Sequence, residues 1–182
     1  MDESTVNSVM DKTATLSESK DLFDGQVHVR KIGESSKVTD AELKKVKNSL
    51  VNIRDKGGSN GKELIAKLMS VEGGTTFVLN DLDENTTFPG SDVILMDINS
   101  ARTFKNLATN KTKVFSSTRL IAHELGHALL RREDAGFRMI SIPPPDGGFG
   151  FGQIKREMYS PNVEATDGIM SGINGSIRRD YN

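Results

Sequence analysis

The sequence predicts an α+β domain in which a short, mainly antiparallel sheet packs on a central helix, with a second functional helix late in the chain. Three observations indicate this fold class. Segments 75–79 and 92–98 are apolar runs of strand length. Segment 118–132 places its apolar residues at helical spacing. The length of 182 residues suits one domain with a tail and excludes a large multidomain protein.

Composition excludes several classes of function. The chain holds 24 Lys and Arg against 25 Asp and Glu, so it has no basic excess with which to bind nucleic acid. It has no cysteine, which excludes disulfides, cysteine-based zinc sites and thiol catalysis. It has three histidines, and two of them lie within five residues of each other.

The amino-terminal segment 1–22 is rich in Ser and Thr and has no long apolar run, a composition typical of disorder. Asp2 and Glu3 lead the chain where a Sec signal would need a basic start. No segment has the roughly 18–20 apolar residues of a membrane span. We therefore expect a disordered segment over 1–22, a folded domain over 23–182 and no membrane span.

The first half of the folded part predicts one strand and two helices. Alternation over 26–32 favours a short, half-buried strand with His28 on its polar side. Thr39 and Glu42 have the spacing of a capping box, which predicts that a helix begins there. Asn60 is the expected N-cap of a second, shorter helix.

The two apolar strands, 75–79 and 92–98, follow, and we expect them to pair in antiparallel fashion. The polar stretch 99–113 has no clear period and predicts a loop. Ser116 or Ser117 is the expected N-cap of the strong helix.

After this helix, segment 137–142 is a candidate strand. Segment 143–152, from Pro143 to Gly152, holds three prolines and four glycines, so it is a loop: either a flap over the site or a surface linker. Ser160 and Pro161 predict the start of a last helix that runs to about Gly172.

The strong helix carries the sequence His123-Glu124-Leu125-Gly126-His127. Residues four apart on a helix differ by about 40° in azimuth, so both imidazoles project from one face and can bind one ion. Two neutral imidazoles suit Zn²⁺, which in a catalytic site takes three protein ligands and one water. Glu124, about 100° round from His123, can take the proton of that water. The pattern predicts a zinc hydrolase with Glu124 as general base.

The third ligand has to be a carboxylate, because the chain has no cysteine and only His28 besides the pair. Five acidic residues after the motif are candidates: Glu133, Asp134, Glu157, Glu164 and Asp167. Glu164 is our choice, because it lies on the expected last helix and looks like the gluzincin arrangement. A solvated helix face is the alternative for Glu164, and solvated charges near the helix end are the alternative for Glu133 and Asp134.

The carboxyl-terminal Arg178-x-x-Tyr181 offers a guanidinium and a phenol. Either group, if it lies near the zinc, can stabilise the oxyanion of a tetrahedral intermediate. A frayed terminus is the alternative interpretation.

The acidic, Ser/Thr-rich start, the His123 to His127 motif and the downstream glutamate helix ending in Arg178-x-x-Tyr181 together resemble the NleD-like zinc metalloproteases. That family comprises bacterial type III effectors and related toxin domains, and the resemblance covers about residues 35–182. It implies a small zincin-like fold with gluzincin-like ligation. The site residues it implies are zinc ligands His123, His127 and Glu164, catalytic Glu124, and Arg178 and Tyr181 beside the zinc.

The same resemblance implies an endopeptidase that is secreted without a Sec signal, by a type III route, and acts in the host cytosol. Its expected partner is a host signalling protein of the MAP kinase type, with a secretion chaperone as a further partner, and we expect a monomer. Two alternatives stay open. One is an interaction module, zinc-stabilised or metal-free, with a relic motif; the other is a zinc amidase or peptidase that acts on bacterial wall peptides.

Overall fold

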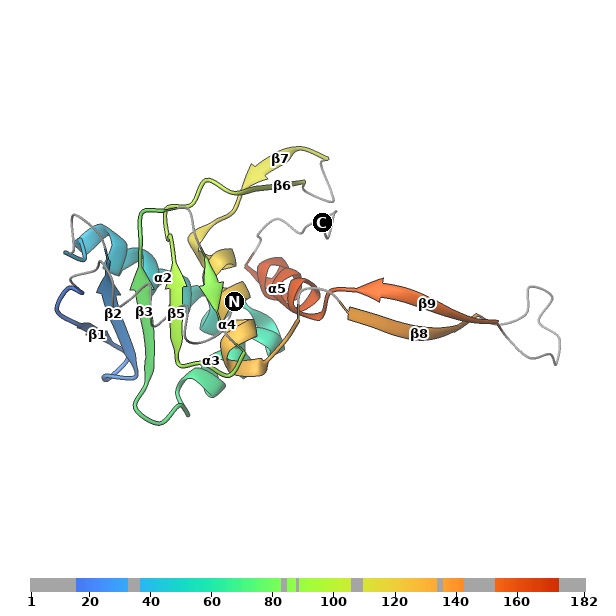
Figure 1. Cartoon of the computed structure of the whole chain (residues 1–182), viewed down its shortest axis with the longest axis horizontal. Helices are drawn as coiled ribbons and strands as arrows, with labels where there is room; N and C mark the ends of the chain where they lie inside the picture. The colour runs from blue at the N-terminus through green and yellow to red at the C-terminus, as the bar shows by residue number, and fades with distance from the viewer. Residues whose placement is uncertain are drawn as a thin grey trace.

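In the computed structural model, a five-stranded sheet packs against helices, and two separate hairpins follow (Figure 1). The structure describes residues 16–32, 37–82, 85–87, 89–105, 110–133, 136–142 and 153–173. The sheet has the order β1-β2-β3-β5-β4 and consists of β1 (Lys20–Leu22), β2 (Val27–Lys31), β3 (Thr75–Leu79), β4 (Thr86–Thr87) and β5 (Val93–Met96). The helices of the described part are α2 (Asp40–Lys56), α3 (Gly58–Leu68), α4 (Ser117–Leu130) and α5 (Pro161–Gly172). The predicted mixture of helices and strands is thereby confirmed.

The two hairpins are separate from the sheet. Strands β6 (Thr103–Lys105) and β7 (Thr112–Val114) pair within the segment that the sequence predicted to be a loop. Strands β8 (Gly136–Ile142) and β9 (Gln153–Tyr159) form a longer hairpin that projects from the body of the molecule between α4 and α5 (Figure 1). Strand β8 matches the predicted segment 137–142, whereas β9 was not predicted.

The sheet is mixed rather than mainly antiparallel. Its outer pairs, β1 with β2 and β4 with β5, are antiparallel, but β2 with β3 and β3 with β5 are parallel. Helices α2 and α3 connect β2 to β3, and such a crossover returns the chain to the same end of the sheet. After β3 the chain forms β4 at the sheet edge and turns back into β5. The prediction of antiparallel pairing between segments 75–79 and 92–98 is therefore wrong.

Helix α2 begins as the sequence predicts. The Thr39 hydroxyl accepts from the Glu42 N–H (3.2 Å), and the Glu42 carboxylate accepts from the Thr39 N–H (2.8 Å). The same carboxylate accepts from Lys31 Nζ (2.8 Å) at the end of β2, and both side chains are almost fully buried. The cap thus joins α2 to the sheet. Helix α3 begins at Gly58, so Asn60 is an interior residue and not the predicted N-cap.

Helix α4 lies at the centre of the fold and contacts α2, α3, α5, β4 and β5 (Figure 1). The core around it is a single cluster of buried apolar side chains from the sheet and from helices α2, α3, α4 and α5. Helix α4 contributes Leu120, Ile121, Ala122, Leu125 and Ala128 to this cluster. Burial of this apolar side fixes the direction in which the other face of the helix points.

Order begins earlier in the chain than predicted. The Ser17 N–H donates to the Lys31 carbonyl (3.1 Å), and β1 pairs with β2. Part of segment 1–22 therefore belongs to the folded domain, while residues 1–15 lie outside the described residues. The predicted flap or linker over 143–152 also lies outside them.

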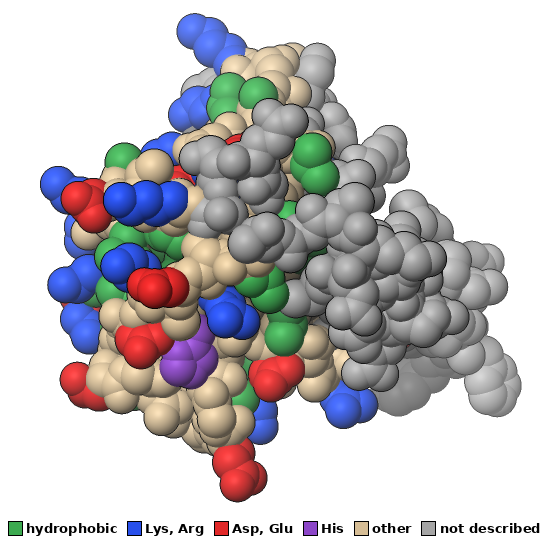
Figure 2. All heavy atoms as spheres, turned by 60° about the vertical axis from the view of Figure 1, so that its left-hand side comes forward, with side chains coloured by type: hydrophobic (Ala, Val, Ile, Leu, Met, Phe, Trp, Pro, Cys, Tyr) green, Lys and Arg blue, Asp and Glu red, His purple; other side chains and the backbone are tan. Residues whose placement is uncertain are grey.

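The surface agrees with the balanced composition. Acidic and basic side chains are interspersed on the face shown in Figure 2. Within the described ranges, each helix is too short or too polar to cross a membrane.

Candidate active site

Helix α4 starts and ends at well-defined caps. The Ser116 hydroxyl accepts from the Arg119 N–H (3.2 Å), as the sequence predicts for one of its two candidate caps. The C-cap is Arg131, which adopts the left-handed conformation (φ 52°) and donates its N–H to the His127 carbonyl (3.1 Å), while the Arg132 N–H donates to the Gly126 carbonyl (3.1 Å). Between these caps, His123 and His127 are half-buried on the face that the core leaves uncovered.

The two imidazoles lie together. Their ring centroids are 4.9 Å apart and their planes are nearly perpendicular, at 86°. This is the arrangement that the spacing of four residues predicts. Two imidazoles this close on one helix face can each offer a nitrogen to one ion.

A main-chain carbonyl fixes the tautomer of His127. Its Nδ1 lies 2.6 Å from the Arg132 oxygen, and a carbonyl oxygen accepts only, so we assign the ring hydrogen to Nδ1. The Nε2 atom then carries the lone pair, which is the form of histidine that ligates metals. The left-handed turn at Arg131 is what brings the Arg132 carbonyl back to the ring.

Glu124 lies on the side of α4 that faces the sheet edge. It is 6% exposed, and its Oε2 accepts a hydrogen bond from the Thr87 hydroxyl (2.6 Å) on β4. The carboxylate is therefore held between the helix and the edge strand, one residue away from His123. Thr87 was not identified from the sequence, because β4 is only two residues long.

Asn162, in the first turn of α5, contacts both the main chain and the ring of His123. Its Nδ2 donates to the His123 carbonyl oxygen (2.9 Å) and lies 3.3 Å from the His123 Nδ1. Its own N–H donates to the Glu133 oxygen (3.1 Å), and its side chain is fully buried. Asn162 thus connects α5, the motif and the chain just beyond α4.

Gly126 makes this contact possible. A Cβ at this position would lie 1.9 Å from the Asn162 Oδ1, so glycine leaves the room that the Asn162 side chain occupies. Glycine inside a helix costs about 1 kcal/mol relative to alanine. A glycine inside a helix therefore indicates that another group packs closely against it. The sequence alone did not identify this group as Asn162.

An ion pair holds α5 one turn earlier along α4. Arg119 Nη1 lies 2.6 Å from Asp167 Oδ1, and both side chains are buried. Arg119, His123 and His127 are spaced four residues apart, so Asp167 approaches the same stripe of α4 that carries the imidazoles. The pairing of Asp167 was not predicted.

The structure brings His123, Glu124 and His127 together. Within the described ranges, no group of three His, Cys, Asp or Glu side chains is placed to hold a metal. Glu164 is exposed on α5, about 200° round from Asn162, and Glu133 is exposed after α4. The side chains of Asp134 and Glu157, and the whole of Arg178 and Tyr181, lie outside what the structure describes.

The donor chemistry at α4 fits part of a zinc site. Two neutral imidazoles are borderline ligands that Zn²⁺ accepts, and one of them has its hydrogen fixed on the nitrogen that would face away from the ion. A buried carboxylate next to them is suited to proton transfer. The described residues therefore offer two candidate ligands and a candidate base.

No family model and no curated protein matches the sequence. Among solved structures, the chain is similar to the crystal structure of the Salmonella zinc metalloprotease effector GtgA, with a TM-score of 0.47 and 15% sequence identity over 80% of this chain and 75% of that one.

Proposed function

We propose that the chain is a zinc-dependent endopeptidase. The observation that carries the proposal is the pair of imidazoles 4.9 Å apart on α4, directly beside the buried carboxylate of Glu124. His123 and His127 would hold the ion. We keep Glu164 as the proposed third ligand, and Asp167, the other carboxylate on α5, as the competing candidate.

A bound zinc supplies Lewis-acid polarisation of the peptide carbonyl and lowers the pKa of a water molecule. The residues of the chain supply the rest. Glu124 takes a proton from the attacking water and transfers it to the leaving nitrogen as the C–N bond breaks. Thr87 holds the Glu124 carboxylate through its hydroxyl. Arg178 and Tyr181 are proposed to stabilise the oxyanion.

The substrate is proposed to lie extended beside β4. This strand ends the sheet order and reaches Glu124 through Thr87, so a polypeptide paired with its outer edge would pass the site. The proposed substrate is a host signalling protein of the MAP kinase type, reached in the host cytosol after type III secretion. That part of the proposal depends on the resemblance stated from the sequence.

The test uses the full chain and its Glu124→Gln variant. We expect one equivalent of zinc in both proteins, similar melting temperatures, and cleavage of proteins in a host-cell lysate by the wild type alone. Equal cleavage by Glu124→Gln would overturn the mechanism. A protein that binds no zinc, or that unfolds globally when zinc is removed, would instead be an interaction module.

The third ligand is tested in the same way. Glu164→Gln and Asp167→Asn are each compared with the wild type in zinc affinity. Loss of affinity in Glu164→Gln alone supports our choice, whereas loss in Asp167→Asn alone transfers the role to Asp167. Melting temperatures separate ligand loss from unfolding, because Asp167→Asn also breaks the buried pair with Arg119.

A further inference from the structure

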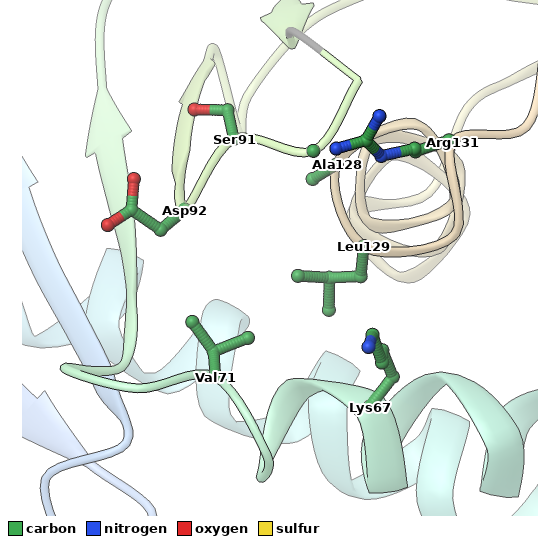
Figure 3. Close-up of a pocket in the computed structure, with 8 residues that line it drawn as sticks. Lys67, Val71, Ser91, Asp92, Ala128, Leu129 and Arg131 are labelled. Carbon is green, nitrogen blue, oxygen red and sulfur yellow. The ribbon is translucent and has the colours of Figure 1, made fainter.

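A small cavity lies beside the carboxyl-terminal end of α4, between α3 and the turn that joins β4 to β5 (Figure 3). Its volume is about 210 Å³, below the roughly 300–1,000 Å³ of typical small-molecule pockets. The space therefore suits one side chain rather than a cofactor. Its lining residues are Lys67, Val71, Gly90, Ser91, Asp92, Ala128, Leu129 and Arg131.

Two cationic side chains, Lys67 and Arg131, line the cavity. Within the part of the chain that the structure describes, Lys67 of α3 and Arg131 form no ion pair, whereas Arg132, next in sequence, binds Glu63 (2.9 Å). Asp92 is the one acid of the lining, and in Figure 3 its carboxylate points away from the Arg131 guanidinium. The side chains of Leu129 and Val71 point into the space between them and form an apolar floor.

The backbone conformation places the Arg131 side chain at the cavity wall. Its φ of 52° is left-handed, a conformation in which glycine or asparagine is the usual residue at a helix end. Its guanidinium lies against Gly90, where a Cβ would be 2.7 Å from Nη2 and 3.0 Å from Cζ. Gly90 itself has φ 83° and donates its N–H to the Ala128 carbonyl (2.7 Å). Two unusual backbone conformations thus meet at the guanidinium.

The cavity is continuous with the elements of the proposed active site. Ala128 follows His127 directly, and the β4–β5 turn that forms one wall begins just after Thr87, the partner of Glu124. A polypeptide extended along β4 turns alternate side chains toward the protein as it passes this wall.

We propose that this cavity is a specificity pocket that receives an acidic side chain, Glu or Asp, of the polypeptide substrate. This inference rests on the proposed endopeptidase function. The carboxylate meets Lys67 and Arg131, and its methylene stem covers Val71 and Leu129. A phosphorylated residue fits less well, because its second negative charge adds to that of Asp92, the acidic residue of the same lining.

The first experiment does not depend on cleavage. N-acetyl-glutamate N-methylamide is titrated into the ¹⁵N-labelled full chain, with the glutamine and phosphoserine analogues as comparisons. We expect shift changes at the amides of Gly90, Leu129 and Arg131, about fivefold weaker binding of the glutamine analogue, and loss of the effect in Lys67→Gln/Arg131→Gln. Equal binding of glutamate and glutamine overturns the pocket, and stronger binding of phosphoserine overturns the choice of a carboxylate.

The second experiment measures specificity on peptides derived from a host proteome. We expect the wild type to prefer an acidic residue at one substrate position, and Lys67→Glu/Arg131→Glu to prefer a basic residue there. Lys62→Glu/Arg54→Glu is the matched control, because both side chains lie outside the cavity, and it should keep the acidic preference. Cleavage without any acidic preference overturns the specificity pocket but agrees with the proposed endopeptidase function. Absence of cleavage overturns the proposed function, while the titration still decides whether the pocket binds a carboxylate.

Discussion

The side-chain amide of Asn162 donates to the main-chain oxygen of His123 at 2.9 Å across the contact between α5 and α4. The two residues are 39 positions apart. Because Asn162 is fully buried and also contacts the His123 ring, it restricts both the backbone and the imidazole of a proposed zinc ligand.

Asn162→Ala should weaken zinc binding by about 10–100-fold, as is typical when a partner of a ligating histidine is removed. The measurement is a chelator competition at a temperature where the variant stays folded. Ser49→Ala is the matched control, because Ser49 is also buried and contacts Ser117 and Thr118 at the other end of α4. A similar loss of affinity in both variants would mean that Asn162 acts only through stability.

Gly126→Ala should destabilise the protein by about 1–3 kcal/mol, although alanine is the better helix former. The reason is the added Cβ, which would lie 1.9 Å from the Asn162 Oδ1. Urea denaturation measures the free energy of unfolding. The double variant Gly126→Ala/Asn162→Ala should recover part of the loss, and strictly additive effects would show that the two residues do not clash.

Thr87→Val should reduce the rate of the proposed cleavage about tenfold while zinc content stays at one equivalent. The substitution removes the hydroxyl that donates to Glu124 and keeps the shape of the side chain. Rate constants at saturating substrate and metal analysis test this. Thr86→Val is a useful control on the same strand, and an equal effect of both changes would rule out a specific role of the hydroxyl.

Stability should change with pH through His28. Hydrogen bonding to Asp21 raises the pKa of His28 despite partial burial, and the same bond lowers the pKa of Asp21. A group with a raised pKa in the folded state stabilises the fold below its unfolded pKa, about 6.5 for histidine, and this contribution is lost as pH rises through the folded value. We expect the urea midpoint of the wild type to fall relative to Asp21→Asn between pH 6 and pH 8. A constant difference over that range would contradict the coupling.

The local features of the fold were predictable and the long-range ones were not. The capping box of Thr39 and Glu42 depends on residues three apart, and the two imidazoles share a face because of helical periodicity alone. The parallel pairing of β3 with β5 was missed because β4, the strand that changes the order, has two residues and no pattern to detect.

The same distinction applies to the candidate site. His123, Glu124 and His127 could be proposed from a pentapeptide, whereas the contacts of Asn162 and Thr87 and the pairing of Arg119 with Asp167 depend on how distant elements pack. Choosing among carboxylates on α5 requires the rotation of that helix against α4, and no short-range pattern in the sequence specifies this rotation.

The bond from the Asn162 N–H to the Glu133 carbonyl closes the chain where it leaves α4 and where it enters α5. The β8–β9 hairpin lies between these two residues, so it is attached to the domain at a point where the chain is already held together. The entropic cost of closing a loop rises only slowly with its length. The connection can therefore lengthen, shorten or be exchanged with little loss in the free energy of unfolding. Segments of different length or sequence can therefore be inserted between α4 and α5, beside the candidate catalytic helix, without a change in how these two helices pack.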